Sequence, residues 1–415
     1  MSTETVGGAC NAAQEAARLA AQKATHLAVQ KHCAAAAALS DDLAAHPELS
    51  NEEFESSRKI VALLKQAGYA VEYPFAGHPT AFKGVIENGS GADVAILVEY
   101  DALPGVGHGC GHNLHGSLSV LTALALTELR DHFTGTISVI GTPAEETDGG
   151  KIAMAEKGVF DSFAAAMMMH SNGGGICQPD MDALSLRNVI LVFKGRAAHA
   201  VASPWKGASA LAAARKCLDL IDARRECFTA DVHVNAIMVD AGRAPNIIPE
   251  RAELHVEFRT DSMGKLTLID DIILKCAKGA ALAMDCEVTW DYPSPDFADM
   301  IRIPALETEA ARIMRSLGLT VAEVDPPLGS TDVGNVSYRC PAVQPLIAIT
   351  KENCALHTAD FAAETQKTAA HAAMALGAET LVTLALRLLN DEGFRGAVHA
   401  EFVKRRDLKL GQFRI

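Results

Sequence analysis

Four short apolar runs, separated by stretches of helical character, most restrict the folds open to this 415-residue chain. They are residues 94–99 (VAILVE), 136–141 (TISVIG), 164–169 (AAAMMM) and 346–350 (LIAIT). Apolar and polar residues do not alternate in them, which is typical of strands covered on both faces, as in a parallel sheet flanked by helices. A helix predicted over 114–130 joins the first two runs into a β-α-β unit. The pattern predicts an α/β domain with a mostly parallel sheet.

Alanine-rich helices are predicted around these runs. One covers roughly 10–46, with a break near His32. A second covers 52–68, with Asn51 as its N-cap and a glycine at its end. A helix near 305–317 and further helices close the chain.

The middle of the chain follows a different order: strand, helix, two strands, helix, strand. This β-α-β-β-α-β succession is the ferredoxin-like split motif. We therefore expect a small domain at 187–298, inserted into a larger domain made of 1–186 and 299–415. The predicted elements are strands 189–194, 232–240, 252–260 and 286–292 and helices 207–224 and 265–284.

Composition restricts the partners that the chain can have. The formal net charge is -14 and no Lys/Arg-rich run is present, which argues against nucleic-acid binding. No apolar run approaches the ~20 residues needed to span a bilayer, and no secretory signal pattern is recognised at the N-terminus. The ten cysteines are scattered singly, which favours reduced, mostly buried thiols. We expect a cytoplasmic protein without nucleic-acid or membrane partners.

Residues that can bind metals follow each of the four apolar runs. In open parallel sheets, ligands bind beyond the carboxyl ends of the strands. We therefore expect these side chains to meet at one edge of the sheet. They are Asp101, Cys110 and His112 after the first run, Glu145 and Glu146 after the second, His170 after the third and His357 after the fourth.

The residue types suit a metal site. Thiolate and imidazole favour zinc, and carboxylates extend the choice to manganese or cobalt. Cys110 and His112 are two residues apart, and the glycines around them let the backbone bend tightly. Five candidate ligands exceed the four of a closed structural zinc site. The number suits two metals about 3.5–4 Å apart that share a water.

Glu145 and Glu146 are adjacent, so on regular backbone their side chains point to different sides. One can then bind metal while the other acts as a general base. A metal-bound water has its pKa lowered to roughly 7, and a carboxylate beside it can pass its proton to a leaving amine. The set indicates metal-assisted hydrolysis of an amide bond.

The segments that carry these residues match one known family. The chain resembles the co-catalytic dinuclear-metal peptidase family of aminoacylases, indole-amino-acid amidohydrolases and carboxypeptidases, from about residue 40 to the C-terminus. The matching segments are EYDALPGVGHGCGHN at 99–113, GTPAEE at 141–146, MMMH at 167–170, GRAAHA at 195–200, NIIPE at 246–250 and GSTDVGNVS at 329–337, followed by His357.

The resemblance implies a role for each candidate residue in the larger, catalytic domain. Glu145 would be the general base, and Asp101 would support the metal site from behind the ligands. Cys110 would bridge the two ions. The implied metal ligands are Cys110, His112, Glu146, His170 and His357.

The resemblance also implies that the inserted domain is a lid that often dimerises, so we expect a homodimer. His199 would hold the scissile carbonyl or its oxyanion, in its own site or in that of a partner subunit. Asn246 and Arg259 would be similar to residues that grip the substrate's carboxylate. Asp332 would also contact substrate, or else it caps the helix or turn that follows it.

Two positions depart from the aminoacylase pattern. Asn113 stands where aminoacylase-like members have Asp, and Ser330-Thr331-Asp332 replaces an Ala-Glu-Asp-Phe stretch. Both features look like the branch of p-aminobenzoyl-glutamate hydrolase subunits and the cytosolic β-alanyl-lysine dipeptidase. They favour a dipeptide or aryl-amide substrate over simple N-acetyl amino acids. His115 is unusual for that branch and is interpreted as a cap of the following helix or a supporting hydrogen-bond partner, as is His108.

The leading hypothesis is a metal-dependent amidohydrolase or dipeptidase with two divalent ions, zinc first among them. Its substrate would be a small N-acyl amino acid, dipeptide or aryl-amide conjugate. The alternatives are a carbamoyl-amide hydrolase of nitrogen metabolism, a structural zinc protein, and a non-catalytic binding protein on the same fold. Glu145 counts against the last, because a binding protein needs no general base.

Overall fold

The chain forms two compact units, each described here by itself. The computed structural model describes residues 4–411 and their side chains from Leu19 onward, so the Cys10 thiol lies outside the described part. The segment 187–298, expected as an inserted domain, falls in the second unit. The first unit contains the chain through Asp182, Ile301–Pro326 and Val336–Arg405, and the second contains Ala183–Met300, Pro327–Asn335 and the residues from Arg406.

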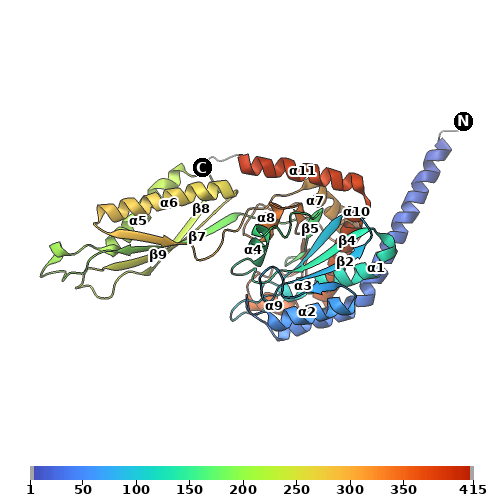
Figure 1. Ribbon diagram of the computed structural model, residues 1–415, viewed down its shortest axis with the longest axis horizontal. Helices are drawn as coiled ribbons and strands as arrows, with labels where there is room; N and C mark the ends of the chain where they lie inside the picture. Colours follow the sequence, from blue (N-terminus) through green and yellow to red (C-terminus); the bar gives the residue numbers. More distant parts are fainter. Residues whose placement is uncertain (1–3, 412–415) are drawn as a thin grey trace. The chain divides into compact units, whose positions relative to one another are not determined.

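A six-stranded sheet forms the centre of the first unit (Figure 1). In the order in which they pair, its strands are β1 (Ala70–Glu72), β2 (Phe82–Asn88), β4 (Gly135–Gly141), β3 (Asp93–Val98), β5 (Ala165–Met167) and β11 (Ala342–Val343). The pairs β4–β3, β3–β5 and β5–β11 are parallel. The pairs β1–β2 and β2–β4 at the other end of the sheet are antiparallel. The sheet is mostly parallel, as expected. Five of the six residues of β3 are buried, which explains why its sequence does not alternate.

Helices pack against this sheet. Those of the first unit are α1 (Glu4–Ala45), α2 (Phe54–Gln66), α3 (His112–Thr127), α4 (Gly150–Glu156), α7 (Pro304–Ser316), α9 (Ala359–Glu364) and α10 (Thr368–Asn390). Helices α1, α3 and α10 contact one another, and α3 and α10 contact β3. Fifteen of the 16 residues of α3 are buried, so this helix is covered on all sides and lies inside the core. A short 3-10 helix, η1 (Arg130–His132), also belongs to the first unit. Two helices contain residues of both units: α8 (Val333–Ser337) and α11 (Glu392–Gly411).

Helix α10 corrects one expectation from composition. By length and hydropathy it is apolar enough to cross a membrane, whereas no run of that kind was expected. Most of its apolar window is buried inside the first unit, where Leu381, Leu384 and Leu388 are fully covered. A buried core helix satisfies the same criteria as a membrane span, and the packing of α10 accounts for its composition.

Three local predictions differ from the structure. Helix α1 is continuous and has no break at His32. Asn51 does not cap α2; its φ of 69° places it outside the helix, its side-chain amide donates to Asp148 at 2.8 Å, and Glu53 is the N-cap residue. The fourth apolar run, residues 346–350, does not join the main sheet. Pro345 separates it from β11, the last strand of that sheet along the chain. Proline has no N–H for a continuous ladder. The chain instead forms β12 (Leu346–Ala348), which makes a two-stranded parallel sheet with β6 (His170–Asn172) and an isolated bridge to Gln178.

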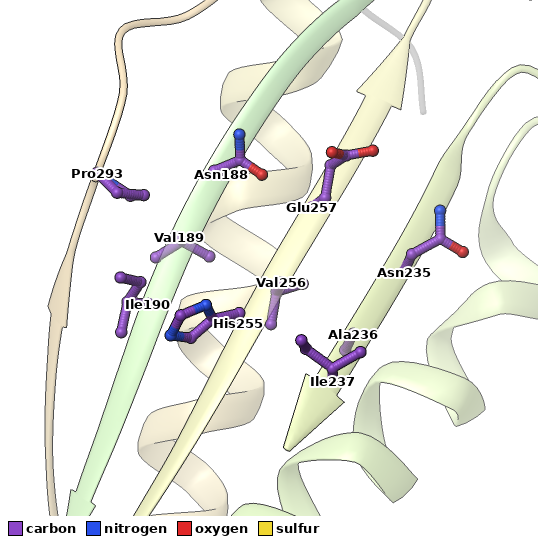
Figure 2. Close-up of a pocket in the computed structure, with 10 residues that line it drawn as sticks. All are labelled: Asn188, Val189, Ile190, Asn235, Ala236, Ile237, His255, Val256, Glu257 and Pro293. Atoms are coloured by element: carbon purple, nitrogen blue, oxygen red, sulfur yellow. The ribbon is translucent and has the colours of Figure 1, made fainter. Parts of the chain in front are cut away.

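The second unit has the predicted β-α-β-β-α-β order. Its elements are β7 (Ser185–Lys194), η2 (Pro204–Lys206), α5 (Ala210–Arg224), η3 (Arg225–Cys227), β8 (His233–Asp240), β9 (Arg251–Thr260), α6 (Met263–Ala283) and β10 (Glu287–Asp291). The strands form an antiparallel sheet in the order β10-β7-β9-β8. Leu191, Leu254 and Ile273 belong to a core between this sheet and the two long helices. On the opposite face, side chains of β7, β8 and β9 line a pocket of about 420 Å³ (Figure 2).

Candidate metal centre

The turn into α3 brings Cys110 and His112 into the core. Gly111 between them is the N-cap of α3 and has a φ of 88°, in the left-handed region that favours glycine. Cys110 is 6% exposed and His112 is fully buried. The glycine therefore lets two potential metal ligands enter one buried region from either side of a tight turn.

The His112 ring is held by Asp101, leaving one nitrogen for a metal. His112 Nδ1 lies 2.9 Å from both Asp101 Oδ1 and the Asp101 carbonyl oxygen. Its Nε2 is buried and has no hydrogen-bond partner among the described residues. That atom faces Glu99 Oε2 at 3.6 Å, Glu145 Oε2 at 3.9 Å and Glu146 Oε1 at 3.9 Å. Glu146 Oε1 is likewise buried without a hydrogen-bond partner. A cation would satisfy both atoms.

Glu145 and Glu146 do not point to opposite sides, contrary to the expectation for regular backbone. Both approach His112 Nε2, because the segment after β4 is not extended: Ala144 has a φ of 59°. Buried Glu53 holds this bend, since its Oε1 accepts the Ala144 N–H at 2.9 Å. Two adjacent carboxylates can therefore serve one centre.

A second group of ligand atoms lies beside the first. One ligand atom each of Cys110, Glu146 and His357 lies within 4.8 Å of the others. His357 Nε2 is 3.7 Å from Glu146 Oε2, and the His357 N–H donates to the Gly109 carbonyl at 2.8 Å. The backbone bond fixes His357 to the loop that carries Cys110. Glu146 belongs to both groups of ligand atoms.

His170 completes the set. Its Nδ1 donates to the Ser171 carbonyl at 2.8 Å, so Nε2 is the acceptor nitrogen, 3.4 Å from Cys110 Sγ. Burial lowers the pKa of His170 to about 4, which keeps the imidazole neutral, the form that binds metals. The structure thus brings together all five residues that the sequence analysis singled out as ligands. It does so with the six-stranded sheet and the two-stranded β12-β6 sheet rather than with one sheet edge.

The donor set fits divalent metal ions. One thiol, three imidazoles and a carboxylate match the preferences of zinc, and carboxylates extend them to manganese and cobalt. Burial raises the pKa of the Cys110 thiol, so its ionisation requires a compensating cation. Burial would also raise the pKa of Asp101, but its interaction with the His112 ring and its hydrogen bonds outweigh burial and lower that pKa. Asp101 Oδ2 in turn accepts from Ser50 Oγ and from the Glu146 N–H.

The remaining candidates lie in the second unit. His199 is exposed, and its Nδ1 accepts from two backbone N–H groups, of Val201 and Ala202. Its Nε2 is therefore the protonated, donating nitrogen. The Ala200 N–H donates to the Asn246 carbonyl at 3.0 Å, so the segments of His199 and Asn246 lie side by side.

Arg259 and Asp332 lie elsewhere in the second unit. Arg259 is half-buried on β9, and donates to Glu257 Oε1 at 2.9 Å and Ser330 Oγ at 3.3 Å. Asp332 is fully buried just before α8, and its carbonyl accepts from the Asn335 N–H at 3.1 Å. Asp332 falls in the stretch Pro327–Asn335 of the second unit.

Sequence reasoning missed three buried charged residues around the centre. Glu53, Glu99 and Lys151 are each 1% exposed or less. Glu99 closes an apolar run, and charged residues are almost never fully buried unless paired, so this position carried a usable signal. Glu53 and Lys151 stand in ordinary polar surroundings in the sequence, and nothing there indicates burial.

Comparison with known proteins identifies the family of the chain. The model of peptidase family M20/M25/M40 matches residues 95–387. A mouse protein named Xaa-Arg dipeptidase is 34% identical over 331 residues, 75% of this chain and 76% of that protein. A p-aminobenzoyl-glutamate hydrolase subunit of Escherichia coli is 27% identical over 434 residues, covering 86% of this chain and 89% of that protein.

A solved structure shares the fold. It is a dinuclear metal-binding peptidase of the M20 family from Bacillus subtilis, with 22% identity and a TM-score of 0.68, over 88% of this chain and 99% of that one. The chain belongs to peptidase family M20/M25/M40. It is a metal-binding hydrolase that cleaves an amide bond, as the sequence analysis indicated.

Proposed function

We propose that this protein is a two-metal dipeptidase or amidohydrolase whose substrate is an amide of an amino acid with a free carboxylate. The observation that carries the proposal is the buried, unpartnered Nε2 of His112, which faces two adjacent carboxylates beside a second group of ligands. The ligands would be Cys110, His112, Glu146, His170 and His357. Zinc suits this set best, followed by manganese and cobalt.

In the proposed reaction, metal ions bound here supply Lewis acidity to the scissile carbonyl and to the attacking water. Glu145 takes the proton from the water and delivers it to the nitrogen of the leaving amine. Asp101 keeps the His112 ring in the orientation that presents Nε2. Glu146 cannot take the role of Glu145 while it serves as a ligand.

The second unit would supply the substrate contacts. The donating Nε2 of His199 suits a carbonyl oxygen that gains negative charge. Asn246, Arg259 and Asp332 would orient the substrate. Arg259 would bind its carboxylate, because a guanidinium matches that group with two parallel hydrogen bonds.

The names of the relatives support the substrate class. Both describe an amide whose amine side is an amino acid, arginine in one and glutamate in the other. We therefore place dipeptides and aryl-amide conjugates ahead of N-acyl amino acids and carbamoyl-amides.

The test is hydrolysis of a substrate panel by protein loaded with zinc, manganese or cobalt, with release of free amine as the readout. The panel contains Xaa-Arg and β-alanyl dipeptides, p-aminobenzoyl-glutamate and N-acetyl amino acids. Glu145→Gln should lower kcat by at least about 10²-fold while two metals per chain remain bound. Glu128→Gln, at a surface pair with Lys31, is the matched control and should be fully active.

Turnover that requires metal and is lost in Glu145→Gln would establish the proposal. Two bound metals without turnover of any substrate would favour a non-catalytic binding protein. One metal per chain would favour a structural zinc site.

We also propose a cytoplasmic homodimer that forms through the second unit. Strand β8 is an edge of its sheet and exposes Ile237 and Val239, which are 64% and 54% accessible. Unpaired edges with apolar side chains favour association. The described cysteines are free thiols, five of them buried, which supports a reducing compartment. Light scattering of Ile237→Lys against wild type tests the dimer, and cell fractionation tests the location.

A further inference from the structure

His115 lies one helical turn after His112 on α3 and is 1% exposed. The helix approaches the end of β3 very closely here. A Cβ on the next residue, Gly116, would lie 2.0 Å from the Glu99 carbonyl oxygen, so only glycine allows this approach. The sequence singled out His115 as unusual, and one interpretation was a helix cap. The cap residue is Gly111, and the His115 side chain is engaged elsewhere.

Both ring nitrogens of His115 are used. Its Nδ1 accepts the Ser171 N–H at 3.2 Å, and the Ser171 hydroxyl is also 3.2 Å away. A nitrogen that accepts from a backbone N–H carries no proton, so the proton lies on Nε2. Nε2 then donates to Glu99 Oε2 at 3.0 Å.

Glu99 is a strong acceptor for this bond because Lys151 keeps it ionised. Lys151 Nζ lies 2.6 Å from Glu99 Oε1, and both side chains are fully buried. The pair carries no net charge, so Glu99 anchors neighbouring groups without adding charge to the centre.

These bonds connect two segments that carry proposed ligands with the segment of Asp101, which holds the His112 ring. His112 begins α3, Glu99 lies two residues before Asp101, and Ser171 follows His170 in β6. Strand β6 pairs only with β12, outside the main sheet, so its position depends on contacts of this kind. The His115 ring lies 4.4 Å from the His170 ring and 5.0 Å from the His112 ring, centre to centre.

We propose that His115 is a positioning residue of the metal centre, which ties the His170 segment and the His112 helix to the Glu99–Lys151 pair and so sets the separation of the two ligand imidazoles. This inference rests on the proposed two-metal function and deepens it. A ring nitrogen of His115 lies within 4.8 Å of potential ligand atoms of Glu99, His112 and His170. Both of its nitrogens are hydrogen-bonded, to Ser171 and Glu99, so we give His115 a hydrogen-bonding role rather than a ligand role.

Three variants of His115 test its hydrogen bonds to Glu99 and to Ser171 separately. His115→Gln keeps an N–H donor near the position of Nε2, His115→Asn keeps an acceptor near the position of Nδ1, and His115→Leu keeps neither. Thr122→Val is the matched control, because its buried hydroxyl bonds only to the Leu118 carbonyl of the same helix. Metal affinity is measured by competition with a chromophoric chelator, and ligand geometry by the visible absorption of the cobalt-loaded protein. Urea unfolding of the metal-free proteins reports general damage.

His115→Leu should weaken metal binding by about 10- to 100-fold and change the cobalt spectrum, while two metals still bind at saturation. His115→Gln and His115→Asn should each recover part of the affinity. Thr122→Val should match wild-type affinity even where its stability falls.

Other results would overturn the inference. Loss of one metal site at saturation in His115→Leu would make His115 a ligand. Equal metal affinity in wild type and His115→Leu, with both binding two ions, would refute the positioning role and leave the proposed function intact. Failure of wild type itself to bind two ions would overturn both.

Discussion

Glu53 holds the backbone next to the proposed general base, although 91 residues separate it from Ala144. Its Oε1 accepts from Ala144 and Asn51 N–H groups, and its Oε2 accepts from Thr80 Oγ1 at 3.0 Å. The left-handed conformation of Ala144 would relax without these bonds, because non-glycine residues are strained there.

Glu53→Ala should therefore lower kcat by about tenfold or more with little change in metal content, since displacing a catalytic group by ~1 Å can cost 10²-fold. It should also reduce stability by ~1–3 kcal/mol, the cost of a buried unpaired N–H. Steady-state kinetics and metal analysis check this result. Glu55→Ala, at an exposed pair with Arg58, is the control. Unchanged kcat in Glu53→Ala would contradict the role.

Asp180 introduces a pH dependence of folding. It is fully buried, accepts from the Gln344 and Met181 N–H groups through Oδ1, and leaves Oδ2 without a hydrogen-bond partner among the described residues. Burial raises its pKa to about 8. A pKa that is higher in the folded than in the unfolded state gives stability that is complete below the unfolded value, near 4. That stability is lost as pH rises towards about 8.

Asp180→Asn has no proton to lose, so it should be less sensitive to pH than wild type. Between pH 5 and 8 the unfolding free energy of wild type should fall relative to that of Asp180→Asn. The fall should be several kcal/mol in total, at about 1.4 kcal/mol per pH unit. Urea titrations at both pH values measure it, with the exposed Asp131→Asn as control. A difference that stays constant with pH would show that Asp180 does not titrate in this way.

Residues of the centre differ in how well their roles can be predicted from the sequence. Cys110, His112 and Glu146 were predictable, because their types are metal ligands and because motifs with special spacing surround them. Glu53 and Lys151 were not, because a burial that depends on partners far along the chain leaves no local pattern.

At the scale of elements, the position of α3 depends on one close contact. Gly116→Ala would bring a methyl group within 2.0 Å of the Glu99 carbonyl, and the helix would have to move. We expect a loss of ~1–3 kcal/mol or more in stability, together with weaker metal binding, because His112 lies on the same helix.

Gly396→Ala in α11 is the matched control, because nothing lies within 4 Å of the added methyl group. It should raise stability slightly, by roughly 0.5–1 kcal/mol, as alanine does in helices. Chemical denaturation and chelator competition measure both variants. Equal behaviour of the two alanine variants would refute the close contact.

The existence and type of the main elements were predictable, whereas their assignment to sheets was not. Apolar runs without alternation correctly indicated buried strands, and the split β-α-β-β-α-β order was read directly. The run at 346–350 was assigned to the main sheet, but strand pairing depends on tertiary packing and Pro345 diverts it.

For the whole molecule, the five proposed ligands belong to the first unit, which has a hydrophobic core separate from that of the second. Removing metal should destabilise the first unit selectively. Each ion at 100 times its Kd contributes ~2.7 kcal/mol to the state that binds it. Scanning calorimetry with and without chelator should show one transition move to lower temperature while the other stays. Equal shifts of both transitions would contradict separate stabilisation.

The amino-acid sequence by itself determined the α/β class and the split motif, because periodicity is a local property. Residue chemistry and the family resemblance indicated the five candidate ligands. Only the tertiary structure decided how the centre is held. It paired Glu53 with Ala144 and Glu99 with Lys151 and His115, and it turned both Glu145 and Glu146 towards His112. These contacts depend on which distant segments share the core, and buried charges are tolerated only where such partners meet.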